Sequence, residues 1–209
     1  MLFSSGANGA GFLARFPVAG GTASGIALGA SPNSILPAAI RVSGAAVLLA
    51  GKFQGSVVAP GLPATTAVGG TDGFLLSVPS TLASPANFFL RFGGALEEDS
   101  NDLVVAKNGD VFIGGRYFST DFAFGSTALA AGSGGGYQGF VGKAVGMTTP
   151  SATAYVSSTG NVSVTSLQTD DAQSYLISGG TYNGLATFAP GVTSTSLQAQ
   201  AGFITRRPF

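Results

Sequence analysis

The feature that most constrains the fold of this chain is an internal repeat. A Gly-Phe pair followed by a strand-like run occurs four times at nearly equal intervals, over 11–15, 73–77, 139–143 and 202–206. A second apolar run keeps this period and carries equally spaced, aligned glycines at Gly51, Gly115 and Gly179. Because self-similarity at a fixed period is typical of repeat architectures, we expect successive copies of one supersecondary unit.

The composition favours β-strands as the content of that unit. Gly accounts for 33 residues and charged residues for only 9% of the chain, while hydrophobic residues reach 45%. Glu, Lys and Gln, the usual residues of exposed helix faces, are scarce, whereas Val, Phe and Thr are frequent. The fold class is therefore predicted to be all-β.

The second repeat shows the expected strands most clearly. Its apolar runs lie at 74–78, 88–92, 102–107 and 110–117, and the last two are joined by Asn108-Gly109, a strong hairpin signal. The third repeat has a similar layout, with runs at 152–158, 161–169 and 173–181. These runs are apolar on both faces, as expected for sheets that stack face to face.

We therefore predict antiparallel four-stranded repeats, about three in number, within one repeat domain over 1–209. The predicted boundaries place a terminal strand of a preceding repeat at 1–16, followed by repeats at 17–78, 79–144 and 145–209.

The second repeat also resembles a known family. The stretches Arg91-Phe92-Gly93-Gly94, Leu103-Val104-Val105-Ala106 and Asn108-Gly109-Asp110-Val111-Phe112-Ile113-Gly114-Gly115, with Asp99 between the first two, are similar to the bacterial β-propeller repeat of the SBBP type. Phe124-Gly125, the Gly-rich segment 132–136 and Gly139-Phe140-Val141-Gly142-Lys143 continue the likeness. The first and third repeats match through their later strands. The resemblance implies propeller blades in a secreted or surface-displayed protein that acts as a binding or display module.

About three blades do not close a ring, because propellers have roughly 4–8. Such an arc would be an incomplete ring or an open array with two exposed apolar faces, and exposed faces of this kind mark an interface. Three explanations stay open: a fragment of a longer chain, a ring closed by two copies, or open-ended stacking into a filament.

The residue inventory argues against most catalytic and nucleic-acid functions. The chain has no His and no Cys, which excludes Ser-His-Asp triads, thiolate metal sites and His-based zinc sites. The net charge is zero, and no basic block is present to bind nucleic acid. No apolar run is long enough for a membrane-spanning helix. The start lacks the features of a signal peptide, as expected of a chain not secreted this way or of a piece of a longer one. We predict no enzyme and, calcium excepted, no cofactor.

One acidic cluster, Glu97, Glu98, Asp99 and Asp102, is the only candidate metal site. Carboxylates are the ligands that calcium prefers, and a carboxylate pair is also the machinery of glycosidases. The alternative is a solvated loop before a strand, in which Asp99 and Asp102 cap turns. Since the cluster occurs in one repeat of three, a repeated metal site is not expected.

The aromatic and basic residues give the remaining candidates. Phe residues at repeat-matched positions are predicted to lie in the core: Phe12, Phe74, Phe140 and Phe203. The tyrosines are better candidates for a binding surface: Tyr117, Tyr137, Tyr155, Tyr175 and Tyr182. Arg15, Lys143 and Arg206 either form a row that contacts a partner or are strand residues whose charges reach solvent. If copies join through their terminal strands, the interface would contain Phe12, Arg15, Phe203 and Arg206.

Two function hypotheses follow, with a third as a further alternative. The first is a non-enzymatic structural or assembly protein of the extracellular surface or of a filament, which self-associates through exposed faces and terminal strands. The second is a module of a larger secreted protein that binds a polysaccharide or another surface protein. A virion structural component shares nearly all of these features.

Overall fold

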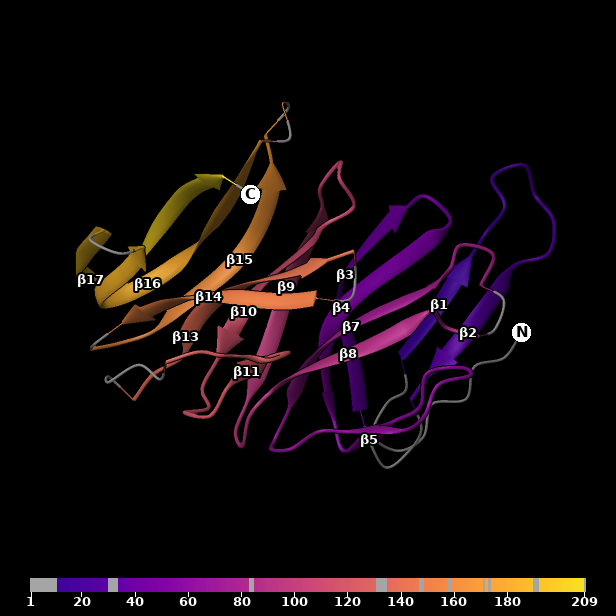
Figure 1. Cartoon of the computed structure of the whole chain (residues 1–209), viewed down its shortest axis with the longest axis horizontal. Coiled ribbons are helices and arrows are strands. Elements are labelled where there is room, and N and C mark those ends of the chain that lie inside the picture. The colour runs from indigo at the N-terminus through magenta and orange to yellow at the C-terminus, as the bar shows by residue number, and fades with distance from the viewer. Residues whose placement is uncertain are drawn as a thin grey trace.

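A computed structural model describes residues 11–29, 34–82, 85–130, 135–146, 149–157, 159–170, 172, 174–189 and 192–208. Every regular element among them is a β-strand, and all strand pairs in the sheets are antiparallel. The all-β prediction is therefore confirmed. In Figure 1 the chain runs across the molecule from the N-terminal hairpin at one end to the C-terminal strands β16 and β17 at the other.

The first large sheet has six strands. Its order is β12-β11-β8-β7-β4-β3, with these bounds: β3 Ser34–Ser43, β4 Ala46–Gln54, β7 Asp72–Pro79, β8 Phe88–Gly93, β11 Ala123–Phe124 and β12 Thr127–Ala128. Two small sheets stand apart from it. One pairs β1 (Gly11–Arg15) with β2 (Ser24–Leu28), and the other pairs β5 (Ser56–Val57) with β6 (Thr65–Thr66).

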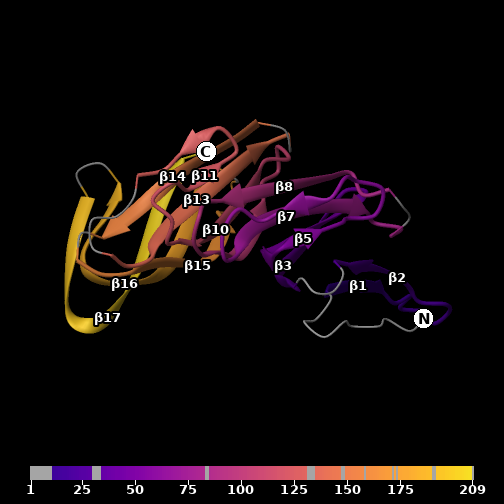
Figure 2. The ribbon, with the colours of Figure 1, turned by 90° about the horizontal axis from the view of Figure 1, so that it is seen from below.

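The second large sheet has seven strands and is strongly curled (Figure 2). Its strands are β9 Glu98–Val105, β10 Val111–Tyr117, β13 Gln138–Val145, β14 Thr149–Ser157, β15 Val162–Thr169, β16 Tyr175–Ala189 and β17 Val192–Pro208. Two residue pairs, Val156 with Thr187 and Ser157 with Ala186, join β14 to β16. The long strand β16 also pairs with β15 and with β17, so it forms the centre of the C-terminal part.

The period of the sequence recurs in the strand pairing. Strands β3, β9 and β15 begin at Ser34, Glu98 and Val162, with the same spacing as the aligned glycines of the sequence. Each of them carries one unpaired extra residue opposite the following strand: Ala38, Asn101 and Thr165. Such an extra residue is a β-bulge, which bends the strand and increases its twist. The bulge is the fifth residue of β3 and the fourth residue of β9 and of β15, so it recurs within one residue of the same place in three successive units. This recurrence ties the sequence repeat to backbone geometry.

Glycines opposite these bulges have a steric reason. A Cβ atom on Gly51 would lie 2.2 Å from the backbone oxygen of Leu36. A Cβ atom on Gly115 would lie 2.0 Å from the backbone oxygen of Asp99, and one on Gly180 would lie 2.0 Å from the backbone oxygen of Ser163. No real Cβ atom approaches an oxygen so closely, so only glycine fits. The third member of this set is Gly180, the neighbour of Gly179, which the sequence period aligns with Gly51 and Gly115.

Three apolar cores fill the spaces between successive groups of strands. The first packs the β1–β2 hairpin on β4 and β7, the second packs β4, β7 and β8 on β9, β10 and β13, and the third packs β10, β13 and β14 on β15, β16 and β17. Strand β4 serves two cores, since Leu49 and Phe53 face the first while Leu48 and Ala50 face the second. The expectation of strands with two apolar faces is thus met.

The predicted strands at 74–78, 88–92 and 110–117 are found as β7, β8 and β10. Asn108-Gly109 forms the expected turn, with Val105 paired to Val111 and a φ of 88° at Gly109. The boundaries after 78 and after 144, however, fall inside β7 and β13. Counted from the bulged strands β3, β9 and β15, the strands fall into three groups, 34–93, 98–157 and 162–208. Within the second group, β11 and β12 pair with β8 of the first sheet, and the second and third groups share the seven-stranded sheet. Residues 1–10 of the predicted terminal strand and 132–134 of the Gly-rich segment lie outside the described residues.

The repeat-matched phenylalanines divide into two kinds. Phe74 and Phe140 are fully buried, and Phe203 packs against the third core, as predicted. Phe12 is 58% exposed, so its prediction as a core residue is wrong. The short β1–β2 sheet is the reason, because it buries Leu13 on its inner face and turns Phe12 outward.

No helix that could span a membrane occurs in the portion of the chain covered by the structure.

Candidate functional site

The four carboxylates of the predicted calcium site lie close in sequence but take different partners. Glu97 is exposed, and its Oε2 accepts a hydrogen bond of 2.9 Å from the Tyr137 hydroxyl. Asp102 is paired with Arg41 at 3.0 Å and also accepts the backbone N–H of Leu167. Both residues thus use their oxygens within the fold.

Among the described residues, no three side chains of Asp, Glu, His or Cys converge as ligands for a metal ion. Glu98 and Asp99 are neighbours on β9 and point to opposite faces of the sheet, as successive strand residues must. The structure therefore does not bring the four predicted carboxylates together. Calcium binding by Glu97, Glu98, Asp99 and Asp102 stays a prediction.

Glu98 instead meets a second buried carboxylate, Asp72. Both side chains are fully buried, and both have an oxygen within 2.8 Å of the position that a Cβ on Gly93 would occupy. Glu98 accepts backbone hydrogen bonds from Gly94 (2.9 Å) and Ser119 (3.2 Å). Burial raises the pKa of Glu98, and the charge of Asp72 adds to the rise, while these hydrogen bonds oppose it.

Asp72 is satisfied on one oxygen only. Its Oδ2 accepts from the backbone N–H of Val68 and from Arg91, while Oδ1 has no hydrogen-bond partner among the described residues. An unpartnered buried oxygen is costly.

Asp99 is the centre of a charge network on the other face of β9. Its carboxylate contacts Lys52 at 2.7 Å and the guanidinium of Arg116 at 2.7 Å and 2.9 Å. Burial acts to raise the pKa of Asp99, but the hydrogen bonds and charges of Lys52 and Arg116 outweigh it and lower the pKa. Two cations on one carboxylate leave the network with one positive charge in excess.

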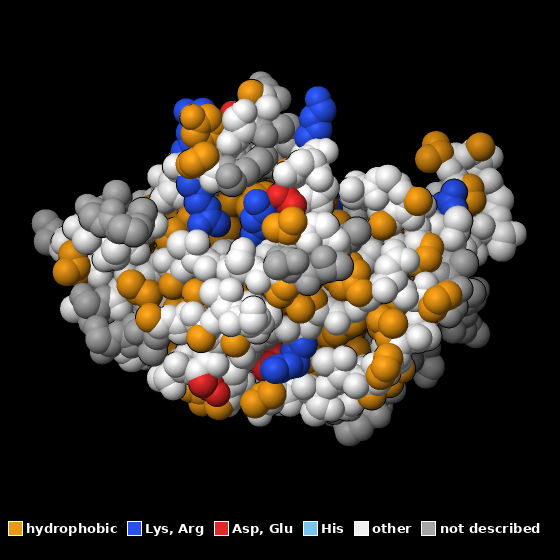
Figure 3. All heavy atoms as spheres, in the orientation of Figure 1, with side chains coloured by type: hydrophobic (Ala, Val, Ile, Leu, Met, Phe, Trp, Pro, Cys, Tyr) orange, Lys and Arg blue, Asp and Glu red, His pale blue; other side chains and the backbone are white. Residues whose placement is uncertain are grey.

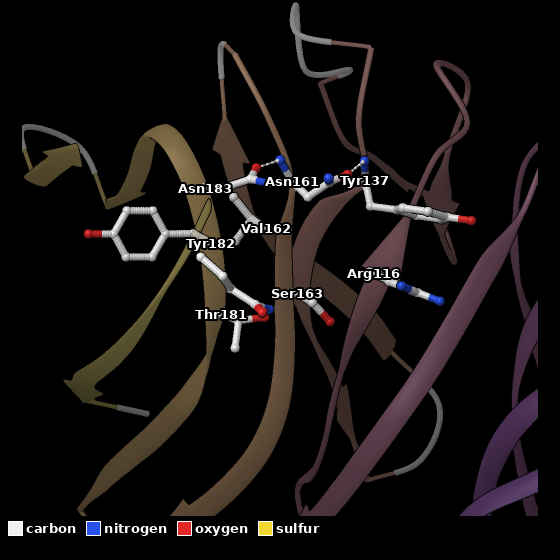
Figure 4. Close-up of a pocket in the computed structure, with 9 residues that line it drawn as sticks. Arg116, Tyr137, Asn161, Val162, Ser163, Thr181, Tyr182 and Asn183 are labelled. Atoms are coloured by element: carbon white, nitrogen blue, oxygen red, sulfur yellow. Dashed lines mark hydrogen bonds between the residues drawn. The ribbon is translucent and has the colours of Figure 1, made fainter. Parts of the chain in front are cut away.

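Arg116 connects this network to a polar pocket of about 380 Å³. The pocket lies between the second and third groups of strands (Figure 4), and its lining residues come from β10, β15, β16, β17 and the loops before and after them: Arg116, Tyr137, Asn161, Val162, Ser163, Thr181, Tyr182, Asn183 and Gln200. Most of these side chains carry an amide, a hydroxyl or a guanidinium group. A volume of this size is within the range of small-molecule sites.

Two asparagines give the pocket a fixed shape. The Oδ1 of Asn161 accepts the backbone N–H of Tyr137 at 2.8 Å, and the Oδ1 of Asn183 accepts the backbone N–H of Asn161. Figure 4 shows both bonds along the upper rim of the pocket. Because each amide is held by the backbone, its orientation does not depend on a ligand.

Tyr137 separates this polar pocket from a second one. One face of its ring lies 4.2 Å from the Arg116 guanidinium carbon, and its centroid is 5.3 Å from that of Phe118. The second pocket, of about 420 Å³, is lined by Gly70, Ala95, Leu96, Glu97, Phe118 and Tyr137. We call the two pockets together, with Tyr137 between them, the Tyr137 groove.

The tyrosines predicted as surface candidates are mostly buried. Tyr117, Tyr155 and Tyr182 lie in the cores, and burial raises the pKa of Tyr117. Tyr137 and Tyr175 remain partly exposed. Tyr137 alone of the five borders both pockets of the groove.

The predicted interface residues do not form one surface. Phe203 faces inward against Tyr155 and Phe188, whereas Arg206 lies over the Tyr175 ring, with its guanidinium carbon 3.6 Å from the ring centroid, and pairs with Asp170 at 3.8 Å. Arg15 is exposed on β1 at the other end of the molecule. Lys143 pairs with Asp110 at 2.9 Å. Lys143 and Arg206 thus find partners within their own sheets, and an interface through Phe12, Arg15, Phe203 and Arg206 stays a prediction.

Sequence reasoning missed most of the groove. Asn161, Asn183 and Gln200 belong to no motif, and they meet because β15, β16 and β17 pair. Asp72 also went unnoticed, although an acidic residue at the start of the apolar run 73–78 is a usable signal.

Comparison of the chain with models of known protein families and with curated protein sequences found no match. The resemblance to the SBBP-type propeller repeat therefore stays a prediction.

Proposed function

We propose that this protein is a non-catalytic binding module and that the Tyr137 groove binds a polysaccharide chain. The single observation that carries the proposal is the position of Tyr137, a partly exposed aromatic ring between a pocket of amides and hydroxyls and a more apolar pocket. Sugars present hydroxyls at their edges and C–H groups on their faces, so they suit polar side chains beside an aromatic wall.

The length of the groove favours a chain over a single sugar. The two pockets measure about 380 and 420 Å³ and share one wall residue, Tyr137. A ligand that fills both must pass this residue. Consecutive units of an oligosaccharide meet that requirement.

The carboxylates support a non-catalytic role. Glycosidase chemistry needs two carboxyl groups that reach the substrate from either side of the bond. Asp72 and Glu98 are fully buried, and Asp99 and Asp102 are held by Lys52, Arg116 and Arg41. Within the described residues, Glu97 is the one carboxylate that lines the groove.

We infer further that the groups 34–93, 98–157 and 162–208 are blades of a propeller-like arc. The first two are four-stranded antiparallel meanders, and apolar cores lie between successive groups. The polar pocket of the Tyr137 groove lies between the second and third of these groups. An extracellular or cell-surface location is part of this proposal.

The test is affinity electrophoresis in native gels that contain a panel of soluble polysaccharides. We expect at least one polysaccharide to retard the protein and Tyr137→Ala to bind about tenfold more weakly, as is usual when a central interface aromatic is truncated. Tyr175→Ala is the matched control, since Tyr175 is the other partly exposed tyrosine and lies outside the groove. Equal loss in both variants, or no retardation by any polysaccharide, would contradict the proposal.

Self-association is a second candidate function. An apolar groove of about 300 Å³ lies between β1, β3 and β4, and it is lined by Leu13, Ala14, Arg15, Ile40, Val42, Val47, Ser80 and Leu82. Figure 3 shows hydrophobic side chains gathered at this end of the molecule, over the β1–β2 hairpin. Since the net charge is zero, little repulsion opposes contact with a second copy of the chain.

A further inference from the structure

We propose that the polar pocket of the Tyr137 groove binds the carboxylate of an acidic polysaccharide such as a polyuronate. This inference rests on the proposed function and deepens it, because it names the substrate class. It follows from three properties of the pocket, which are its hydrogen-bond donors, its charge and its contrast with the neighbouring pocket.

The two asparagines of the pocket offer donors rather than acceptors. The amide oxygens of Asn161 and Asn183 are both taken by backbone N–H groups, of Tyr137 and of Asn161 respectively. Each side chain therefore has only its NH₂ group left for a ligand. Neither NH₂ group has an acceptor among the described residues. Two amides fixed in this orientation select a ligand that accepts hydrogen bonds.

The charge of the pocket is positive. Arg116 donates hydrogen bonds from Nε and Nη2 to Asp99. Its Nη1 group has no acceptor in the part of the chain that the structure describes. Lys52 also binds Asp99, so Arg116 is not fully neutralised. The lining residues of the pocket include no Asp and no Glu. A guanidinium group with a remaining donor pairs strongly with a carboxylate.

The neighbouring pocket has the opposite character. It is lined by Glu97, which would repel an acid, and by the apolar side chains of Leu96 and Phe118. A polyuronate would therefore place one carboxylate beside Arg116 and a sugar ring against Phe118. The positive pocket thus fixes the position of the acidic group along the chain.

The test is isothermal titration calorimetry with two matched probes, an oligogalacturonate and the same oligomer with its carboxyl groups methyl-esterified. We expect the acid to bind at least about tenfold more tightly, because a charge-assisted hydrogen bond is lost in the ester. Equal affinities for the two probes would overturn this inference and leave the proposed function standing. If neither probe nor any neutral polysaccharide binds, the proposed function itself fails.

A variant localises the selectivity. Arg116→Gln should reduce the ratio of acid to ester affinity to near one, whereas Arg116→Lys should keep part of it. Dextran sulfate and polyglutamate are the control polyanions. If they bind as tightly as oligogalacturonate, the pocket is a general anion site and the inference is wrong. Should Arg116→Gln fail to fold, the two probes on the unmodified protein still decide the matter.

Discussion

At the scale of single residues, the most unusual feature is the buried pair of Asp72 and Glu98. The next unit shows that the fold does not require it. The backbone N–H of Glu98 donates to the Thr71 oxygen at 2.8 Å, and in the next unit that of Val162 donates to the Tyr137 oxygen at 2.8 Å. Val162 therefore occupies the position of Glu98. Gln138, which follows Tyr137, occupies the position of Asp72, which follows Thr71. The same backbone geometry forms with neutral side chains. The pair is thus a local feature of one unit, with its own dependence on pH.

Glu98 should make the stability of the protein fall as the pH rises. Because burial raises the pKa of Glu98, the folded state binds its proton more tightly than the unfolded chain does. This stabilisation is complete below the ordinary pKa near 4.5 and is lost as the pH rises through the raised pKa of the folded state. Thermal unfolding between pH 4 and pH 8 should therefore show a steeper decline for the native protein than for Glu98→Gln.

Asp102→Asn is the control for this experiment, since Asp102 lies on the same strand and is paired with Arg41 at the surface. Parallel curves for the native protein and Glu98→Gln would mean that the Glu98 carboxyl is ionised in the fold.

At the scale of elements, the repeated bulge decides which glycines matter. The residue just before each bulge pairs with a glycine on the following strand. These glycines are Gly51 in β4, Gly115 in β10 and Gly180 in β16. In each case a backbone oxygen of the bulged strand occupies the space of a Cβ atom. The residue just after the bulge pairs with the preceding residue of that strand, which is Ala50 in the first unit and Gly179 in the third. An alanine is thus already present at one of these neighbouring positions.

Gly115→Ala and Gly180→Ala should each reduce the free energy of unfolding by about 2–3 kcal/mol, because their Cβ atoms would overlap with backbone that cannot move freely. Gly179→Ala should cost less than about 1 kcal/mol, since its nearest neighbour to a new Cβ is 3.7 Å away. Urea unfolding followed by circular dichroism measures all three. A larger loss for Gly179→Ala than for Gly180→Ala would show that the register of β16 is different.

At the scale of the whole molecule, the three cores lie in series, and each is shared by two groups of strands. The groups at either end therefore have one face that packs on a neighbour and one that does not pack within the described residues. At the N-terminal end this outer region includes exposed apolar side chains, among them Phe12, Phe16, Ile40 and Val42. Apolar area of this kind is typical of surfaces that bind another protein.

If a second copy covers this region, the mass in solution should exceed that of one chain and should depend on concentration. Val42→Asp should then shift the mass to that of a monomer, because it places a charge in the apolar groove. Leu185→Asp is the matched control, an exposed strand residue on β16 far from the groove along the chain. Static light scattering measures this mass. If the native protein has the mass of a monomer at every concentration, self-association is ruled out.

Much of the fold could be predicted from local patterns. The strands at 74–78, 88–92 and 110–117 and the turn at Asn108-Gly109 depend on short apolar runs, β-propensity and a positive φ, which neighbouring residues determine. The grouping of these strands was harder, since a period fixes the length of a unit but leaves open where it starts. The candidate site was the least accessible, because Arg116, Asn161 and Gln200 lie in three different strands or loops.

By itself, then, the sequence determined an all-β chain with a regular internal period, since apolar runs, turn residues and repeats are properties of nearby positions. Only the tertiary structure decided that Glu98 is buried against Asp72 while Asp99 binds Lys52 and Arg116. It also decided that Tyr137, alone of the five tyrosines, borders both pockets of the groove. The physical reason is that burial, charge pairing and pockets arise where distant strands meet, and a strand pattern does not specify which side chains meet there.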